Sequence, residues 1–168
     1  MKKGLLHITL AMVRIEGEEG VEEAKKLMRD LKPELSNILA DKSKATIKIE
    51  NLKSFGQRVV YADVTPAHDE TFWKFANLVR TSLDNASDLV KSSNSFDYHS
   101  DYVPHLTLAK VSRPVARERR SKYIPTSYYQ EFEGLRFGEQ GLDNLQLCVI
   151  DSSTRYDGFY NTLAQLQF

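Results

Sequence analysis

Hydrophobic and polar residues follow two different periods along this chain. Alternating or short continuous apolar runs predict β-strands over residues 5–13, 46–50, 59–64, 145–150 and 161–168. Between these runs, apolar residues recur every three or four positions over 21–38 and over about 69–85, which predicts two helices that each bury one face. The pattern therefore predicts an α+β fold.

Turn-forming residues and prolines set the expected limits of these elements. Pro33 lies inside the first helical segment, and we expect it to kink or split that helix because proline lacks an N–H and clashes with the preceding turn. Asp69 or a neighbour is expected to cap the second helix. The turn at 54–57 predicts a hairpin between its flanking strands, and 92–101 is expected to be a loop.

Similar signals divide the second half of the chain. Pro104 immediately precedes His105 and suits the first residue of a strand. Residues 112–132 are expected to be irregular or helical. Residues 152–158 are expected to join the last two strands.

Two four-residue runs are nearly identical. Residues 7–10 are His-Ile-Thr-Leu and residues 105–108 are His-Leu-Thr-Leu. Because side chains alternate between the two faces of a strand, the histidine and threonine of each run point to one face and the apolar residues to the other. Composition alone would rarely produce both runs, so we interpret them as functional motifs; the alternative is that both histidines pack within strands.

The repeat predicts two lobes of a single domain over 1–168, roughly 5–55 and 59–168, related by a pseudo-two-fold axis. Such an axis would bring the two histidine strands together in the middle and place both motifs across one central cleft. Each lobe would then contribute one imidazole and one hydroxyl. These come from His7 with Thr9 and from His105 with Thr107.

Charge narrows the kind of ligand that this cleft would take. The 23 basic and 23 acidic residues balance, so no overall positive charge favours binding of long nucleic acid. Binding of a short anionic ligand in a local pocket is compatible with this balance. One basic cluster predicts a solvated helix face or loop, with phosphate binding as the alternative. Its members are Arg113, Arg117, Arg119, Arg120 and Lys122.

Cysteine use and hydropathy suggest the compartment. Cys148 is the single cysteine and lies in an apolar run, so we expect a buried strand thiol without a disulfide partner, in a reducing compartment. No apolar run approaches the roughly 18 residues of a membrane span, and the start of the chain is unlike a signal peptide. We expect a soluble intracellular protein, cytoplasmic or nuclear, without membrane contact.

The two His-x-Thr motifs resemble those of the two-histidine (2H) phosphoesterases. This resemblance implies a bilobal α+β fold with antiparallel sheets, helices on the outside and a central cleft. It implies a metal-independent activity on 2′,3′-cyclic phosphates, 2′,5′-linked oligonucleotides or RNA ends, with His7 and His105 as the catalytic residues and Thr9 and Thr107 binding the substrate.

Further segments sharpen the resemblance, which runs over most of residues 5–168. They are similar to the nuclear-localisation-signal-like central domain of A-kinase anchoring proteins and to relatives encoded in the leukocyte receptor cluster. These segments are 104–110, 129–132, 136–139 with 145–148, and 158–160. Family members usually carry another strand and helix before the first histidine strand. Because six residues precede His7 here, we expect the first lobe to lack that strand and helix.

Phosphodiester cleavage explains why such a site needs these residue types. One histidine can take a proton from the attacking hydroxyl or water and the other can give one to the leaving oxygen, because their ordinary pKa near 6.5 allows both states. The threonine hydroxyls can donate to the phosphate oxygens. No cofactor or metal is then required, and His68, His99, Asp97 and Asp101 lack convincing ligand spacing.

Three alternative functions are consistent with these motifs. The first is a phosphodiesterase that cleaves 2′,5′-linked oligoadenylate or related short RNA. The second is a non-catalytic module of a scaffold protein that binds a nucleotide such as AMP, and the third is an enzyme that processes RNA ends or cyclic phosphates. In each case Tyr102 and Phe55 are candidates to stack on a base, with a place in the core or at the rim as the alternative.

Overall fold

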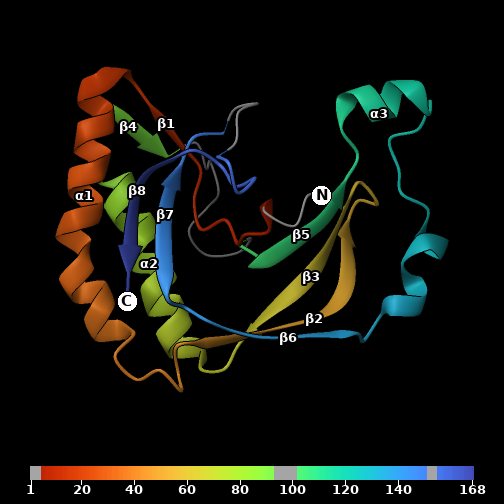
Figure 1. Ribbon diagram of the computed structural model, residues 1–168, viewed down its shortest axis with the longest axis horizontal. Coiled ribbons are helices and arrows are strands. Elements are labelled where there is room, and N and C mark those ends of the chain that lie inside the picture. The colour runs from red at the N-terminus through yellow and green to blue at the C-terminus, as the bar shows by residue number, and fades with distance from the viewer. Residues whose placement is uncertain (1–4, 93–101, 151–154) are drawn as a thin grey trace.

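Two long helices and three antiparallel sheets make up the part of the chain that the structure describes, residues 5–92, 102–150 and 155–168 of a computed structural model (Figure 1). The α+β class is therefore confirmed. The strands are β1 (Val13–Ile15), β2 (Thr46–Phe55), β3 (Val59–Pro66), β4 (Val90–Ser92), β5 (His105–Lys110), β6 (Arg136–Gly141), β7 (Asn144–Cys148) and β8 (Thr162–Gln167). The helices are α1 (Gly17–Ile38), α2 (Asp69–Asp84) and α3 (Arg113–Glu118), with short 3₁₀ turns η2 at Thr126–Tyr128 and η3 at Gln130–Phe132.

The largest sheet has the strand order β5-β3-β2-β6, with all neighbours antiparallel. Its centre is the predicted hairpin of β2 and β3. Residues 56–58 join the paired residues Phe55 and Val59, and Gly56 and Gln57 have positive φ values of 52° and 55°, which tight turns between antiparallel strands use. The edge strand β6 was not predicted, because every one of its residues is exposed and it shows no apolar alternation.

The proposed division into repeats passes through this hairpin. The first repeat was placed at 5–55 and the second at 59–168, yet β2 and β3 pair along their whole length within one sheet. The strands β7 and β8, although late in the chain, lie beside α1 (Figure 1). The assignment of the chain to two repeats and one domain stays a prediction.

Helix α1 is continuous through Pro33, so the predicted split into two helices is wrong. Pro33 lies on the exposed side of the helix, where the carbonyl that loses its hydrogen bond can turn to water instead. The opposite face carries the buried residues Ala24, Met28 and Leu35. Burial of that face outweighs the loss of one hydrogen bond.

The start of α1 passes close to the chain that precedes β4. A Cβ on Gly20 would lie 2.9 Å from the carbonyl oxygen of Leu89, so only glycine allows this approach. The contact holds α1 against the β1-β4 pair.

Helix α2 follows its prediction closely. It ends at Asn85 as expected, and the residue that caps it is His68, a neighbour of Asp69. The Nδ1 atom of His68 accepts a hydrogen bond from the Thr71 N–H at 3.2 Å. His68 thus has a structural role at a helix terminus.

The helices and the β7-β8 pair enclose the main apolar core. Phe75, Val79 and Leu83 of α2 meet the buried face of α1 and Leu166 of β8. Figure 1 shows this group on one side of the molecule, with the four-stranded sheet and α3 on the other side. None of the helices in the described part of the chain is long and apolar enough to cross a membrane.

The segment predicted as a strand over 5–13 is mostly not one. Ile8 forms a single antiparallel bridge with Leu106, and regular pairing begins only at Val13, where β1 meets β4. Leu10, Ala11 and Met12 make no backbone hydrogen bond to any described residue. The prediction was wrong over 5–12 because a strand requires a paired neighbour, and in this stretch only Ile8 has one among the described residues.

An apolar hollow of about 990 Å³ borders that segment. The segment itself, the inner face of α1 and the strand β7 line it. Within the described residues, β7 pairs with β8 alone, so its other edge is open. The first motif and the open edge of β7 thus border the same hollow in the described part of the chain.

Most of the two expected loops lies outside the described residues. The structure describes neither 93–101 nor 151–154, which include His99, Asp97 and Asp101. The expected irregular or helical stretch from 112 to 132 is confirmed as α3 followed by η2 and η3.

Candidate functional site

The bridge between Ile8 and Leu106 fixes how the two motifs face each other. In an antiparallel pair the positions on either side of the bridge are also opposite, so Thr9 lies across from His105 and His7 across from Thr107. Opposite residues project to the same face, and the two histidines are diagonal neighbours at about 7–8 Å between Cα atoms. The structure therefore places all four motif residues together.

The apolar members of the motifs form the back of the site. Ile8 and Leu106 both pack against one buried cluster, which consists of Ile47, Val64, Phe72 and Ala76. The expected division, with polar residues in front and an apolar core behind, is confirmed. Packing of both motifs on one cluster restrains them relative to each other.

Each histidine makes the same short-range hydrogen bond. The Nδ1 atom of His7 lies 2.7 Å from the carbonyl oxygen of Leu5, and Nδ1 of His105 lies 2.8 Å from that of Val103. Because a carbonyl can only accept, Nδ1 carries the proton in both rings. Each neutral ring therefore has its lone pair on Nε2, the atom that can accept a proton from a substrate.

Two aromatic rings flank each histidine. The centroid of His105 lies 5.0 Å from that of Phe55 and 5.3 Å from that of Tyr61, and the centroid of His7 lies 5.3 Å from that of Tyr160. Phe159 completes the second group, 6.4 Å from His7. All four contacts are edge-to-face or strongly inclined, which restricts rotation of the imidazole rings.

Phe55 lies at the site, as the sequence suggested. Its ring stacks on Tyr61 with a centroid separation of 4.1 Å and an angle of 19°. The residue is 38% exposed. With Tyr61 on one face, Phe55 keeps exposed surface for another planar group.

Tyr102 lies behind the site. Its hydroxyl donates to the Thr9 carbonyl oxygen at 3.0 Å, the Arg80 guanidinium lies 4.7 Å from the ring centroid, and Trp73 contacts the ring. Burial raises the pKa of the Tyr102 phenol. These contacts favour the core alternative for Tyr102, and its stacking on a base stays a prediction.

The threonine hydroxyls are available for a ligand. Thr9 and Thr107 are half-buried, and neither hydroxyl has a hydrogen-bond partner among the described residues. A half-buried hydroxyl without a protein partner can donate to an oxygen of a bound anion.

Sequence reasoning missed three polar or aromatic residues on the same face. Asp63 pairs directly with His105 and Tyr61 with Thr107 in the β3-β5 register, and Lys53 pairs with Tyr61 in the β2-β3 register. Lys53 and Asp63 form an ion pair at 2.5 Å, and the hydrogen bond to Asp63 raises the pKa of Lys53. The period of two in the predicted hairpin could have identified this face, although not its position beside His105.

The basic cluster lies on the surface, and Cys148 lies in a strand. The five cations of the cluster are all exposed on α3 and the turn that follows, which confirms a solvated surface; phosphate binding there stays a prediction. Cys148 lies in the strand β7 as expected, but it is half-buried rather than buried. Burial still raises the pKa of its thiol, which disfavours a nucleophilic thiolate.

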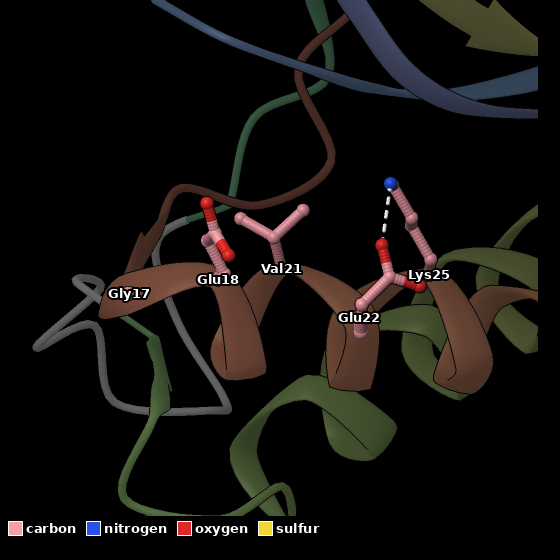
Figure 2. A pocket seen from close by; sticks show the side chains of 5 residues that line it. All are labelled: Gly17, Glu18, Val21, Glu22 and Lys25. Carbon is pink, nitrogen blue, oxygen red and sulfur yellow. Dashed lines mark hydrogen bonds and ion pairs between the residues drawn. The ribbon is translucent and has the colours of Figure 1, made fainter.

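A second, shallower hollow lies at the start of α1 and contains no motif residue. Figure 2 shows that Glu18, Glu22 and Lys25 border it, with Lys25 paired to Glu22 at 2.7 Å. The hydrogen bond from Lys25 lowers the pKa of the Glu22 carboxyl. Two carboxylates against one paired cation would repel an anionic ligand. Across the described residues, no group of three or more His, Cys, Asp or Glu side chains could hold a metal ion.

Comparison with known proteins supplies an independent finding. Residues 1–168 match the family described as the AKAP7 2'5' RNA ligase-like domain. The chain is also similar to A-kinase anchor protein 7 isoform gamma of Homo sapiens, with 28% identity over 160 residues. The match covers 94% of this chain and 44% of that protein, so the chain spans less than half the length of this curated relative.

Proposed function

The chain belongs to the AKAP7 2'5' RNA ligase-like domain family, and from that premise we propose that it is a phosphodiesterase that cleaves short 2′,5′-linked oligonucleotides. The family is of the two-histidine phosphoesterase type.

One observation carries the proposal. Both histidines have Nδ1 occupied by a backbone carbonyl, and each lies across from the threonine of the other motif. Two imidazoles with free Nε2 atoms can act as a base and an acid on opposite sides of one phosphate, while Thr9 and Thr107 hold its oxygens. Pure binding would not need two such histidines.

The reaction can use an internal nucleophile. In a 2′,5′-linked substrate the neighbouring 3′-oxygen attacks phosphorus, and one histidine accepts its proton at Nε2. The bond from phosphorus to the 5′-oxygen breaks, and the other histidine, protonated, gives that oxygen its proton. The products are a 2′,3′-cyclic phosphate and a 5′-hydroxyl. Attack by water, which would give a linear phosphate, is the alternative, and either histidine can take either role.

The test is incubation with 2′,5′-linked oligoadenylate in EDTA, with chromatography of the products. We expect cleavage to continue in the chelator, because the two motifs supply the acid, the base and the phosphate donors. Loss of cleavage that zinc or magnesium restores would overturn the metal-independent mechanism. The same panel includes 3′,5′-linked RNA and 2′,3′-cyclic phosphates, and preference for these would favour an enzyme that processes RNA ends.

A second candidate is a nucleotide-binding module within a scaffold. The observation that favours it is the similarity to a protein named as an A-kinase anchor protein. Calorimetric binding of AMP without cleavage of any substrate in the panel would support this candidate and contradict the enzyme. A nuclear or cytoplasmic location is part of either proposal.

A further inference from the structure

The aromatic rings beside the two histidines come from unrelated parts of the chain. Phe55 and Tyr61 flank His105 from the β2-β3 hairpin, whereas Phe159 and Tyr160 flank His7 from the segment before β8. The sequence motifs repeat, but these rings do not. The structure nevertheless surrounds both imidazoles in a similar way.

The segment that carries the second pair is a closed turn. The Arg155 N–H donates to the Phe159 carbonyl oxygen at 2.8 Å, and the Phe159 N–H donates to the Asp157 carboxylate at 3.0 Å. Arg155 and Asp157 form an ion pair, and Gly158 has a φ of 83°, which suits glycine. These bonds fix the direction in which Phe159 and Tyr160 leave the turn.

The turn is also tied to the sheet behind it. The Arg155 Nη1 atom donates to the Thr162 hydroxyl at 3.2 Å, and that hydroxyl donates to the Gln146 side chain at 3.1 Å. Thr162 belongs to β8 and Gln146 to β7. The turn therefore has a rigid base, as a binding surface requires.

The rings of this turn border the apolar hollow beside His7. Phe159 and Tyr160 are half-buried and line the apolar hollow together with His7 and Thr9. Their mutual contact, at 5.5 Å and 73°, is edge-to-face, and no described aromatic ring stacks parallel to either. A planar ligand group beside His7 would meet an apolar aromatic surface.

We propose that Phe159 and Tyr160 form a second nucleobase-binding surface, so that the site takes two consecutive nucleotides with the phosphate between the histidines. Phe55 with Tyr61 binds one base and the 159–160 pair binds the other. This inference rests on the proposed function for the identity of the ligand, and it adds the minimum length of that ligand. A single nucleotide would fill only one of the two surfaces.

The test measures binding rather than cleavage, so that it can fail independently of the proposed activity. The probes are AMP and a 2′,5′-linked dinucleotide of 3′-deoxyadenosine, which lacks the internal nucleophile, titrated by calorimetry. We expect Phe159→Leu and Phe55→Leu each to lower the affinity for the dinucleotide about tenfold, because stacking on an aromatic ring contributes that much or more per base. Only one of the two substitutions should lower the affinity for AMP, because a single nucleotide has one base.

Two control variants keep the result interpretable. Tyr156→Leu removes a fully exposed ring from the same turn, with no contact to His7, and should bind both probes like the parent. Phe159→Tyr keeps an aromatic ring at the site and should retain dinucleotide binding, which separates stacking from a folding defect. Equal affinity of the parent for the two probes, or unchanged dinucleotide binding by Phe159→Leu, would overturn the two-base site. Cleavage of the 2′,5′-linked substrate by a protein that binds both probes equally would support the proposed function and contradict the two-base site.

Discussion

The two motif histidines owe their chemical state to their own neighbours in sequence. Each Nδ1 donates to the carbonyl two residues earlier, so the tautomer is set by a local contact in the sequence. Because this bond uses Nδ1, it leaves Nε2 to interact with a substrate. The roles proposed for His7 and His105 can therefore be tested separately.

Replacement of either histidine should lower turnover strongly. We expect His7→Ala and His105→Ala each to reduce kcat about 10²–10⁴-fold, because each removes one proton transfer. The double variant should fall far short of the product of both losses, since the two groups act in one step. Steady-state kinetics with circular dichroism as a folding control measure this. A single variant with a near-normal rate would contradict the paired mechanism.

The threonines should contribute through their hydroxyls alone. Thr9→Val and Thr107→Val keep the shape of the side chain, so the fold should persist while AMP binding and cleavage weaken. Each lost hydrogen bond to a charged phosphate oxygen corresponds to roughly 1.5–3 kcal/mol. Calorimetric titration of AMP against both variants gives the values. Parental affinity and rate in both variants would mean that the His-x-Thr pairs serve strand packing.

Tyr102 should affect stability at high pH. Burial raises the pKa of its phenol in the folded state, so the neutral form contributes stability that is fully present below the ordinary tyrosine pKa of about 10. That contribution is lost as the pH rises from there towards the folded pKa. We expect the free energy of unfolding to fall above about pH 10, and Tyr102→Phe to flatten this decline. Urea unfolding at a series of pH values tests it, and an unchanged decline in the variant would assign the effect to other groups.

At the scale of elements, the first motif has little backbone pairing with the rest of the described chain. One bridge to Leu106 and one hydrogen bond from Tyr102 secure it, whereas β5 pairs with β3 over five positions. The apolar hollow borders this motif and the strand β7, whose other edge has no partner strand among the described residues. The first motif is therefore the less constrained half of the site.

Hydrogen exchange should show this difference. Leu10, Ala11 and Met12 have no backbone partner among the described residues, so their amides should exchange much faster than those of Val60 and Ala62 in the middle of β3. Exchange measured by mass spectrometry or NMR gives both rates in one experiment. Protection of residues 10–12 equal to that of β3 would show that another strand covers this edge.

At the scale of the whole molecule, charge balance limits the ligand. With 23 basic and 23 acidic residues, the chain has no net positive charge to attract long nucleic acid. Nearby cations are engaged, as Lys53 is by Asp63 and Arg155 by Asp157. Recognition should depend on the cleft rather than on the general surface.

Salt should therefore have a modest effect on binding. For one or two phosphate contacts with a single-stranded ligand, affinity should fall only about three- to sevenfold between 50 and 200 mM salt. Titration of the 2′,5′-linked dinucleotide at both concentrations measures it. A fall of a hundredfold or more would indicate many phosphate contacts, and would point to the basic cluster on α3.

The sequence alone determined the local features of this protein. Apolar spacing located α1 and α2, turn residues located the β2-β3 hairpin, and strand alternation placed His and Thr on one face of each motif. All of these depend on residues within a few positions of each other, so the chain's own pattern is sufficient. Resemblance of the motifs then pointed to the two-histidine phosphoesterases.

Only the tertiary structure decided how these pieces meet. The bridge between Ile8 and Leu106, the ring contacts of both histidines, and the hydrogen bond from Tyr102 to Thr9 join residues that are far apart in the chain. Strand register depends on which edges are available, and sequence periodicity says nothing of that. For the same reason, the segment before Val13 has the pattern of a strand without a full partner. Pro33 stays within one helix because packing of its opposite face outweighs a local preference.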